Sequence, residues 1–121
     1  MLCQIPDISK GVISLFVSGR LSAQDYRTRL QPAIKSYRKD WNQVCLYIEA
    51  DVLLEGWEFG SLTGSGEVQL PEFDALVFVG GPDWVGNSVR LMGPFMQGEV
   101  AWFPLERKQD AVSWIAKRSA C

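Results

Sequence analysis

Four short runs of apolar residues predict buried β-strands. They cover residues 12–17, 44–49, 75–79 and 100–103. Each run is rich in β-branched or aromatic residues and has glycine, proline or charged residues nearby, a pattern typical of strands covered on both faces. Residues 2–5 precede a Pro-Asp turn signal and predict an antiparallel edge strand beside the first run.

Apolar residues between these runs recur at helical spacing. Ser22, with Asp25 three residues later, is a variant of the capping box, so a helix is expected to begin there. Pro32 interrupts the apolar stripe of that helix and predicts a kink or a break. A second helix is predicted within residues 82–93, and a last one after residue 104.

This alternation of strands and helices predicts an α/β fold. We expect a mainly parallel, four- to five-stranded sheet with an N-terminal antiparallel edge strand and helices on its faces. The length of 121 residues corresponds to one domain, 1–121. Residues 60–66 contain three glycines, so whether the crossover there is a helix or a loop stays open.

Composition removes several classes of function. The net charge of −2 offers no positive field for a nucleic acid. The absence of histidine removes the usual catalytic triads and histidine metal sites, so we predict no catalytic residue, no metal and no cofactor. Three separated cysteines fit a reducing compartment, and no apolar run is long enough to span a membrane, so a cytoplasmic location is expected.

An acidic group follows the second predicted strand, at the end where open α/β sheets bind ligands. It contains Glu49, Asp51, Glu55 and Glu58. These carboxylates could hold Mg²⁺ or act in acid-base chemistry. A solvated acidic rim is favoured instead, because the chain has no phosphate-binding motif with which a magnesium site would work.

Several segments together resemble the SpoIIAA-like family, which has a STAS/CRAL-TRIO-type fold. The resemblance covers nearly the whole chain, and the segments that carry it lie at residues 11–12, 18–26, 32–33, 55–57, 73–79, 84, 98–103 and 110–115. It implies a non-catalytic binding or regulatory module that acts through protein or small-ligand binding. The alternatives are a carrier of a small apolar or amphipathic ligand, resembling CRAL-TRIO proteins, and an enzyme of unrecognised type.

The resemblance also raises the question of a phosphorylation switch, because STAS-fold anti-sigma-factor antagonists are phosphorylated on a serine. Their motif resembles Asp-Ser-Ser-Gly, and no such string occurs here. Ser61, Thr63 and Ser65 are therefore interpreted as loop hydroxyls exposed to solvent.

A ligand-binding site is predicted where the second and third core strands end. Open parallel sheets leave a crevice there, and both loops carry a tryptophan. The candidate residues are Glu49, Asp51, Glu55, Trp57, Gly80, Gly81 and Trp84. The carboxylates favour a neutral, amphipathic or cationic ligand. Five tryptophans and a short edge strand further suggest a homodimer.

Overall fold

The protein is an α/β sandwich of helices around one main sheet. The computed structural model describes residues 2–6, 8, 11–21, 28–29, 31–40, 44–57, 74–92 and 98–119. The main sheet contains β1 (Leu2–Gln4), β2 (Val12–Val17), β4 (Cys45–Ala50), β6 (Ala75–Gly80) and β7 (Glu99–Phe103), in that spatial order. β1 is antiparallel to β2, and every other pairing is parallel. The predicted sheet is confirmed, including its antiparallel edge strand.

A small second ladder lies beyond the carboxyl ends of β2 and β4. It pairs β3 (Arg20–Leu21) with β5 (Gly56–Trp57) in parallel. The amide of Asp51 donates to the Val17 carbonyl over 2.9 Å, and the amide of Glu55 donates to the Gly19 carbonyl over 2.7 Å. These bonds hold the loop after β4 against the loop after β2.

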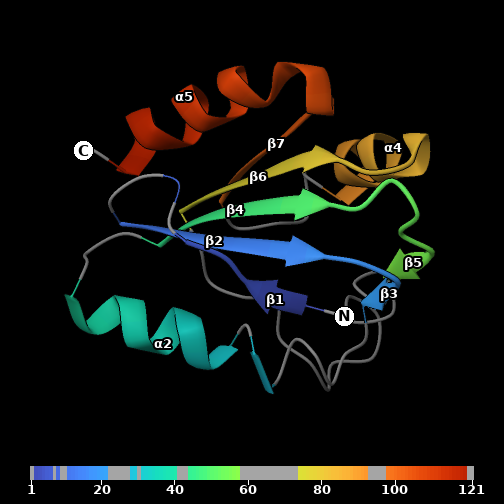
Figure 1. Ribbon diagram of the computed structural model, residues 1–121. Coiled ribbons are helices and arrows are strands. Elements are labelled where there is room, and N and C mark those ends of the chain that lie inside the picture. Colours follow the sequence, from blue (N-terminus) through green and yellow to red (C-terminus); the bar gives the residue numbers. More distant parts are fainter. Residues whose placement is uncertain are drawn as a thin grey trace.

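Helices cover both faces of the sheet, as Figure 1 shows for α2 and α5 on opposite sides. On one face, α2 (Gln31–Asp40) and α4 (Asp83–Met92) contribute Ile34, Val85 and Val89 to a core with the side chains of Leu46 and Phe78. On the other face, α5 (Lys108–Ser119) packs on the sheet, and a 3-10 turn, η3 (Leu105–Arg107), leads into it. Its residues Ala111 and Ile115 pack on Tyr47, Val77 and Val79.

The alternation of side chains along each strand explains this arrangement. In β4, Leu46, Ile48 and Ala50 face α2 and α4, whereas Cys45 and Tyr47 face α5. A strand that must bury both sets of side chains reads as a continuous apolar run, which is why β4 and β6 were recognisable in the sequence.

The structure refines the predicted helices. α4 and α5 are confirmed, and α5 begins at Lys108, after η3. Pro32 is the second residue of α2, and Thr28 and Arg29 just before it have π-helical geometry, so regular α-helix begins next to the proline expected to interrupt it. The predicted start at Ser22, and the glycine-containing crossover at residues 60–66, lie outside the described residues.

Candidate functional site

The predicted site lies where the carboxyl ends of β4 and β6 lie side by side. Gly80 and Gly81, at the end of β6, have φ angles of 77° and 80°, a conformation that favours glycine. A Cβ on Gly81 would lie 3.0 Å from the Cβ of Ala50, the last residue of β4. The turn after β6 therefore approaches the end of β4 closely, as expected for parallel neighbours.

The loop that follows β4 has two exposed apolar side chains between two carboxylates. Asp51 is partly exposed, and its Oδ1 accepts a 2.9 Å hydrogen bond from the amide of Leu53. Val52 and Leu53 are 62% and 78% exposed, and Glu55 is exposed as well. The loop thus presents two apolar side chains to solvent between two acidic residues.

A third exposed apolar side chain stands beside this loop. Leu105, in η3, is 48% exposed, and its Cβ lies 3.7 Å from the position of a Cβ on Gly80. The carbonyl oxygen of Ala50 lies 3.2 Å from that same position. Leu105 and the start of the β4 loop therefore flank Gly80 together. We call Val52, Leu53 and Leu105 the apolar tip.

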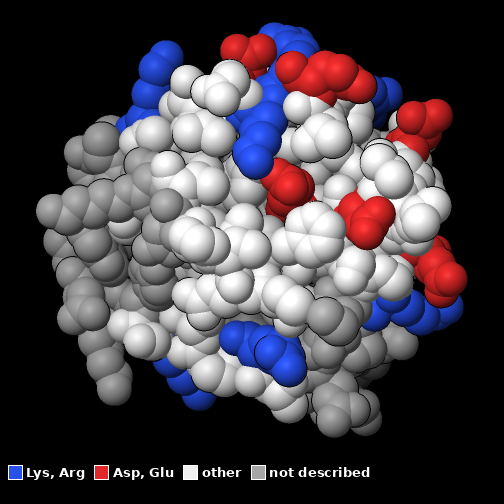
Figure 2. Space-filling view, viewed as in Figure 1, with Lys and Arg blue, Asp and Glu red and all other residues white. Residues whose placement is uncertain are grey.

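Acidic side chains predominate around the apolar tip. Asp83 and Glu106 are exposed at the starts of α4 and η3. Figure 2 shows much of the acidic surface of this view at its upper and right sides, and the right side corresponds to the carboxyl ends of the strands in Figure 1. Arg107 is the nearest cation along the chain, and its Nε pairs with the Asp110 carboxylate at 2.8 Å.

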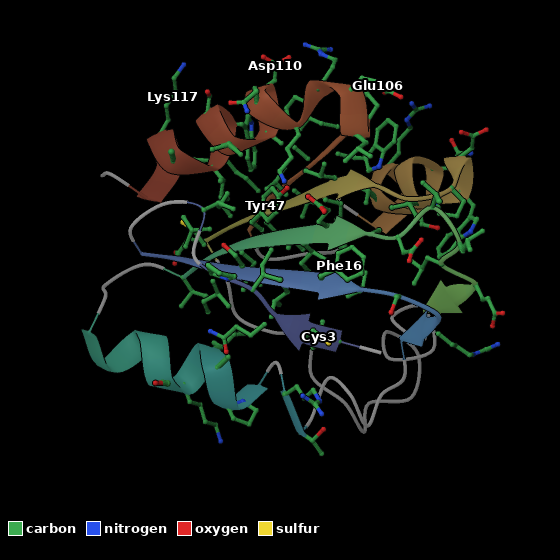
Figure 3. The ribbon with its side chains drawn as sticks, in the orientation of Figure 1. Cys3, Phe16, Tyr47, Glu106, Asp110 and Lys117 are labelled. Atoms are coloured by element: carbon green, nitrogen blue, oxygen red, sulfur yellow. The ribbon has the colours of Figure 1, made fainter. Side chains whose placement is uncertain are left out.

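Glu49 and Trp84, two of the predicted site residues, lie on opposite faces of the sheet. Its Oε1 accepts a 2.9 Å hydrogen bond from the Tyr47 hydroxyl and lies 3.0 Å from Lys108 Nζ. It is on the α5 side of the sheet, where Figure 3 shows Tyr47 below the helix. Trp84 packs partly buried against the core on the opposite side. The structure does not bring Glu49 and Trp84 together.

Tyr47, Glu49 and Lys108 form a polar cluster under the first turn of α5. Burial, and then the hydrogen bond and negative charge of Glu49, raise the pKa of Tyr47 above its ordinary value. A phenol held neutral in this way is a hydrogen-bond donor and not a base at physiological pH. The spacing of Tyr47 and Glu49 places both on one face of a strand, whereas nothing in the sequence pattern points to Lys108.

This pKa shift predicts a pH dependence of stability. In the unfolded chain Tyr47 loses its proton near pH ~10, whereas in the folded protein it keeps the proton to higher pH. The free energy of unfolding is therefore constant below pH ~10 as far as Tyr47 is concerned, and it falls above that pH by up to about 1.4 kcal/mol per pH unit. Tyr47→Phe is expected to decline less steeply than the wild type above pH ~10. Urea unfolding across alkaline pH measures both curves, and parallel curves would contradict the assignment.

Two further residues considered from the sequence, Trp57 and Glu58, lie partly or wholly outside the described part of the chain. The backbone of Trp57 pairs with Leu21 in the small ladder, while the side chain of Trp57 and all of Glu58 lie outside the described part. Within that part, no three Asp, Glu or Cys side chains form a group able to hold a metal ion. The sequence interpretation missed the apolar tip, although a run of three apolar residues, Val52 to Leu54, between two acids just after a strand was the available signal.

Comparison with known proteins identifies the family. No curated protein matches the chain. The structure is similar to the crystal structure of an uncharacterized protein from the DUF3478 family with a SpoIIAA-like fold, from Shewanella loihica PV-4. The TM-score is 0.62 and the identity 19%, over 94% of this chain and 93% of that one. The family model described as SpoIIAA-like matches residues 12–116. The chain therefore belongs to the SpoIIAA-like family.

Proposed function

We propose that this protein is a non-catalytic, STAS-like binding module that binds a protein partner at the carboxyl ends of β2, β4 and β6. The observation that supports this most directly is the apolar tip, with exposed Val52, Leu53 and Leu105 on acidic segments of the chain. Large apolar side chains exposed close to one another on a polar surface are characteristic of interaction sites, and Leu105 and Ala50, which precedes Val52 and Leu53, both flank Gly80. The proposed site combines this tip with the predicted residues Asp51, Glu55, Trp57, Gly80, Gly81 and Trp84, and Glu49 borders it from the α5 face.

The charges around the tip favour a basic, amphipathic partner segment. Asp51 and Glu55 flank Val52 and Leu53 along the chain, Glu106 follows Leu105, and Asp83 lies at the start of α4, so the segments that carry the tip are acidic. Of the cations near the tip, Arg107 and Lys108 are paired with Asp110 and Glu49, and Arg20 lies in the small ladder opposite Gly56, next to Glu55. A partner that presents apolar residues together with lysine or arginine would cover the tip and meet these carboxylates, whereas an anionic partner would be repelled.

The other functions considered from the sequence have less support. A carrier would need an enclosed apolar cavity, and the described residues at the strand ends form an exposed tip. An enzyme would need reactive groups that converge on a substrate, and Glu49, the best-placed carboxylate, is occupied by Tyr47 and Lys108. Within the described part of the chain, none of the helices combines the length and apolar character needed to cross a bilayer. The homodimer and the cytoplasmic location stay predictions.

The proposal is tested with a fluorescein-labelled amphipathic helix of leucine and lysine as the probe. Fluorescence anisotropy should detect binding to the wild type, and the double substitution Val52→Ser and Leu53→Ser should weaken it about tenfold, because two largely exposed apolar contacts are lost. Neither side chain belongs to the core, so the far-UV circular dichroism and the melting temperature should be unchanged.

Two matched variants locate the site. Glu55→Gln removes a carboxylate beside the tip and should weaken binding of the probe. Glu99→Gln removes a carboxylate at the other end of the sheet, where Glu99 pairs with Arg118 at 2.7 Å, and should leave binding unchanged. Equal effects of both variants, or a serine double variant that binds like the wild type, would contradict the proposed site.

A further inference from the structure

The outer edge of β7 carries backbone groups that no other described strand pairs. β7 is the last strand in the order of the sheet. The Glu99 amide donates to the Asp74 carbonyl over 3.1 Å, so the backbone groups of Glu99 point toward β6. Because these groups alternate in direction along a strand, those of Val100 and Trp102 point outward, away from the sheet. An unpaired edge of this kind is a template for another strand.

A pocket of about 280 Å³ lies beside this edge, between α4 and β7. Its lining residues are Gly86, Val89, Arg90, Val100, Ala101 and Trp102. The indole of Trp102 lies against Gly86, where an added Cβ would come within 3.1 Å of the ring, and Nε1 donates to the Gly80 carbonyl over 3.0 Å. The hydrogen bond and the close contact fix the indole, so the pocket has a preformed apolar wall.

Arg90 gives the pocket a positive charge on one side. It is exposed on α4, and no carboxylate among the described residues lies within salt-bridge distance of it. Arg90 follows Gly86 by about one helical turn, and α4 runs back from the carboxyl end of β6 toward the start of β7. The cation therefore lies nearer the amino end of β7, and the indole nearer its carboxyl end.

We propose that the β7 edge binds an extended peptide segment of a partner protein by strand addition. The partner backbone pairs with the outward groups of Val100 and Trp102. One apolar partner side chain enters the pocket against Trp102, and an acidic side chain two positions away on the same face meets Arg90. The pocket is smaller than most small-molecule sites, which favours a single side chain over a whole ligand. This edge is separate from the apolar tip and takes a partner of opposite charge.

The test uses capped, fluorescein-labelled seven-residue peptides of alternating threonine and valine, with phenylalanine and aspartate two positions apart in either order. Anisotropy should show saturable binding for one order. Arg90→Gln should weaken it about tenfold, as should replacement of the peptide aspartate by asparagine, because a charge-assisted contact is lost. Arg107→Gln, an exposed arginine paired with Asp110, is the matched control and should have no effect.

Two further changes test the backbone pairing itself. Val100→Pro removes an outward N–H but no bond to β6, and proline is tolerated at such edge positions, so the variant should fold and lose the peptide. Methylation of the peptide amides that face β7 should abolish binding with the protein unchanged, which keeps the test valid if Val100→Pro does not fold.

Three results would overturn strand addition. The first is methylated peptide that binds as tightly as the unmodified one. The second is competition by 3-phenylpropionate. If this small carboxylate displaces the labelled peptide at concentrations similar to those of the peptide, filling the pocket suffices for binding and backbone pairing is not needed. The third is a dimer. If light scattering shows that the unliganded protein is a dimer and that Val100→Pro makes it a monomer, a second copy of the chain occupies the edge.

Discussion

Gly81→Ala is expected to lower the free energy of unfolding by about 2 to 4 kcal/mol. Gly81 has a φ of 80°, which strains any residue with a side chain, and an added Cβ would lie 2.8 Å from Val85 Cγ2 and 3.0 Å from Ala50 Cβ. Both neighbours are buried and cannot move aside without disturbing the core. The expected loss therefore combines backbone strain with a steric clash.

Gly19→Ala is the matched control, because it separates these two causes. Gly19 also has a positive φ, 62°, but a Cβ there would meet no heavy atom within 4 Å. Only the strain applies, so the expected loss is about 1 to 2 kcal/mol. Urea unfolding of both variants measures the difference. If the two alanine substitutions lower the free energy of unfolding equally, the steric clash at Gly81 does not contribute to the loss.

Phe78→Ala is expected to lower the free energy of unfolding by about 3 to 5 kcal/mol. Phe78 is 1% exposed in β6, which has a paired strand on each side, and it packs in the core that α4 covers. Truncation leaves a cavity that the surrounding strands cannot close, since they are fixed by their ladders on both sides. Such a loss is a large share of the stability of a small domain.

Phe16→Ala provides the comparison on a less covered part of the sheet. Phe16 lies in β2 on the α5 face and is only partly buried; Figure 3 shows it beside Cys3 of β1, away from the helix. Less apolar area returns to water on truncation, so the loss should be less than half of that for Phe78→Ala. The midpoints of urea unfolding decide this, and comparable losses would mean that Phe16 is covered as fully as Phe78.

The fold was largely predictable because the buried strands leave a local signature. Residues 12–17 and 75–79 are continuous apolar runs, since each strand faces a helix layer on both sides, and the structure has β2 and β6 at these positions. β4 begins one residue later than predicted, at Cys45, because the amide of Val44 bonds the Asp74 carboxylate at 2.6 Å and not a neighbouring strand. Boundaries depend on such tertiary contacts, which no local pattern encodes.

The site was only partly predictable, for the same reason. The sequence shows which residues follow two neighbouring strands: Asp51, Glu55, Gly80 and Gly81. In a parallel sheet such residues lie at the same end of the strands. The face on which each side chain lies depends on register. Glu49 is the fifth residue of β4 and shares the α5 face with Tyr47, so it turns away from the side on which Trp84 packs.

The sequence by itself determined the α/β class, the order of the strands along the chain, the antiparallel first strand and the acidic character of the strand ends, because periodicity and charge are local properties. Only the tertiary structure decided that Lys108 neutralises Glu49, that Leu105 stands beside the loop carrying Val52 and Leu53, and that Trp102 and Arg90 line one pocket. These residues are distant in sequence and meet only because parallel strands need long crossovers, which bring helix ends and strand edges together in space.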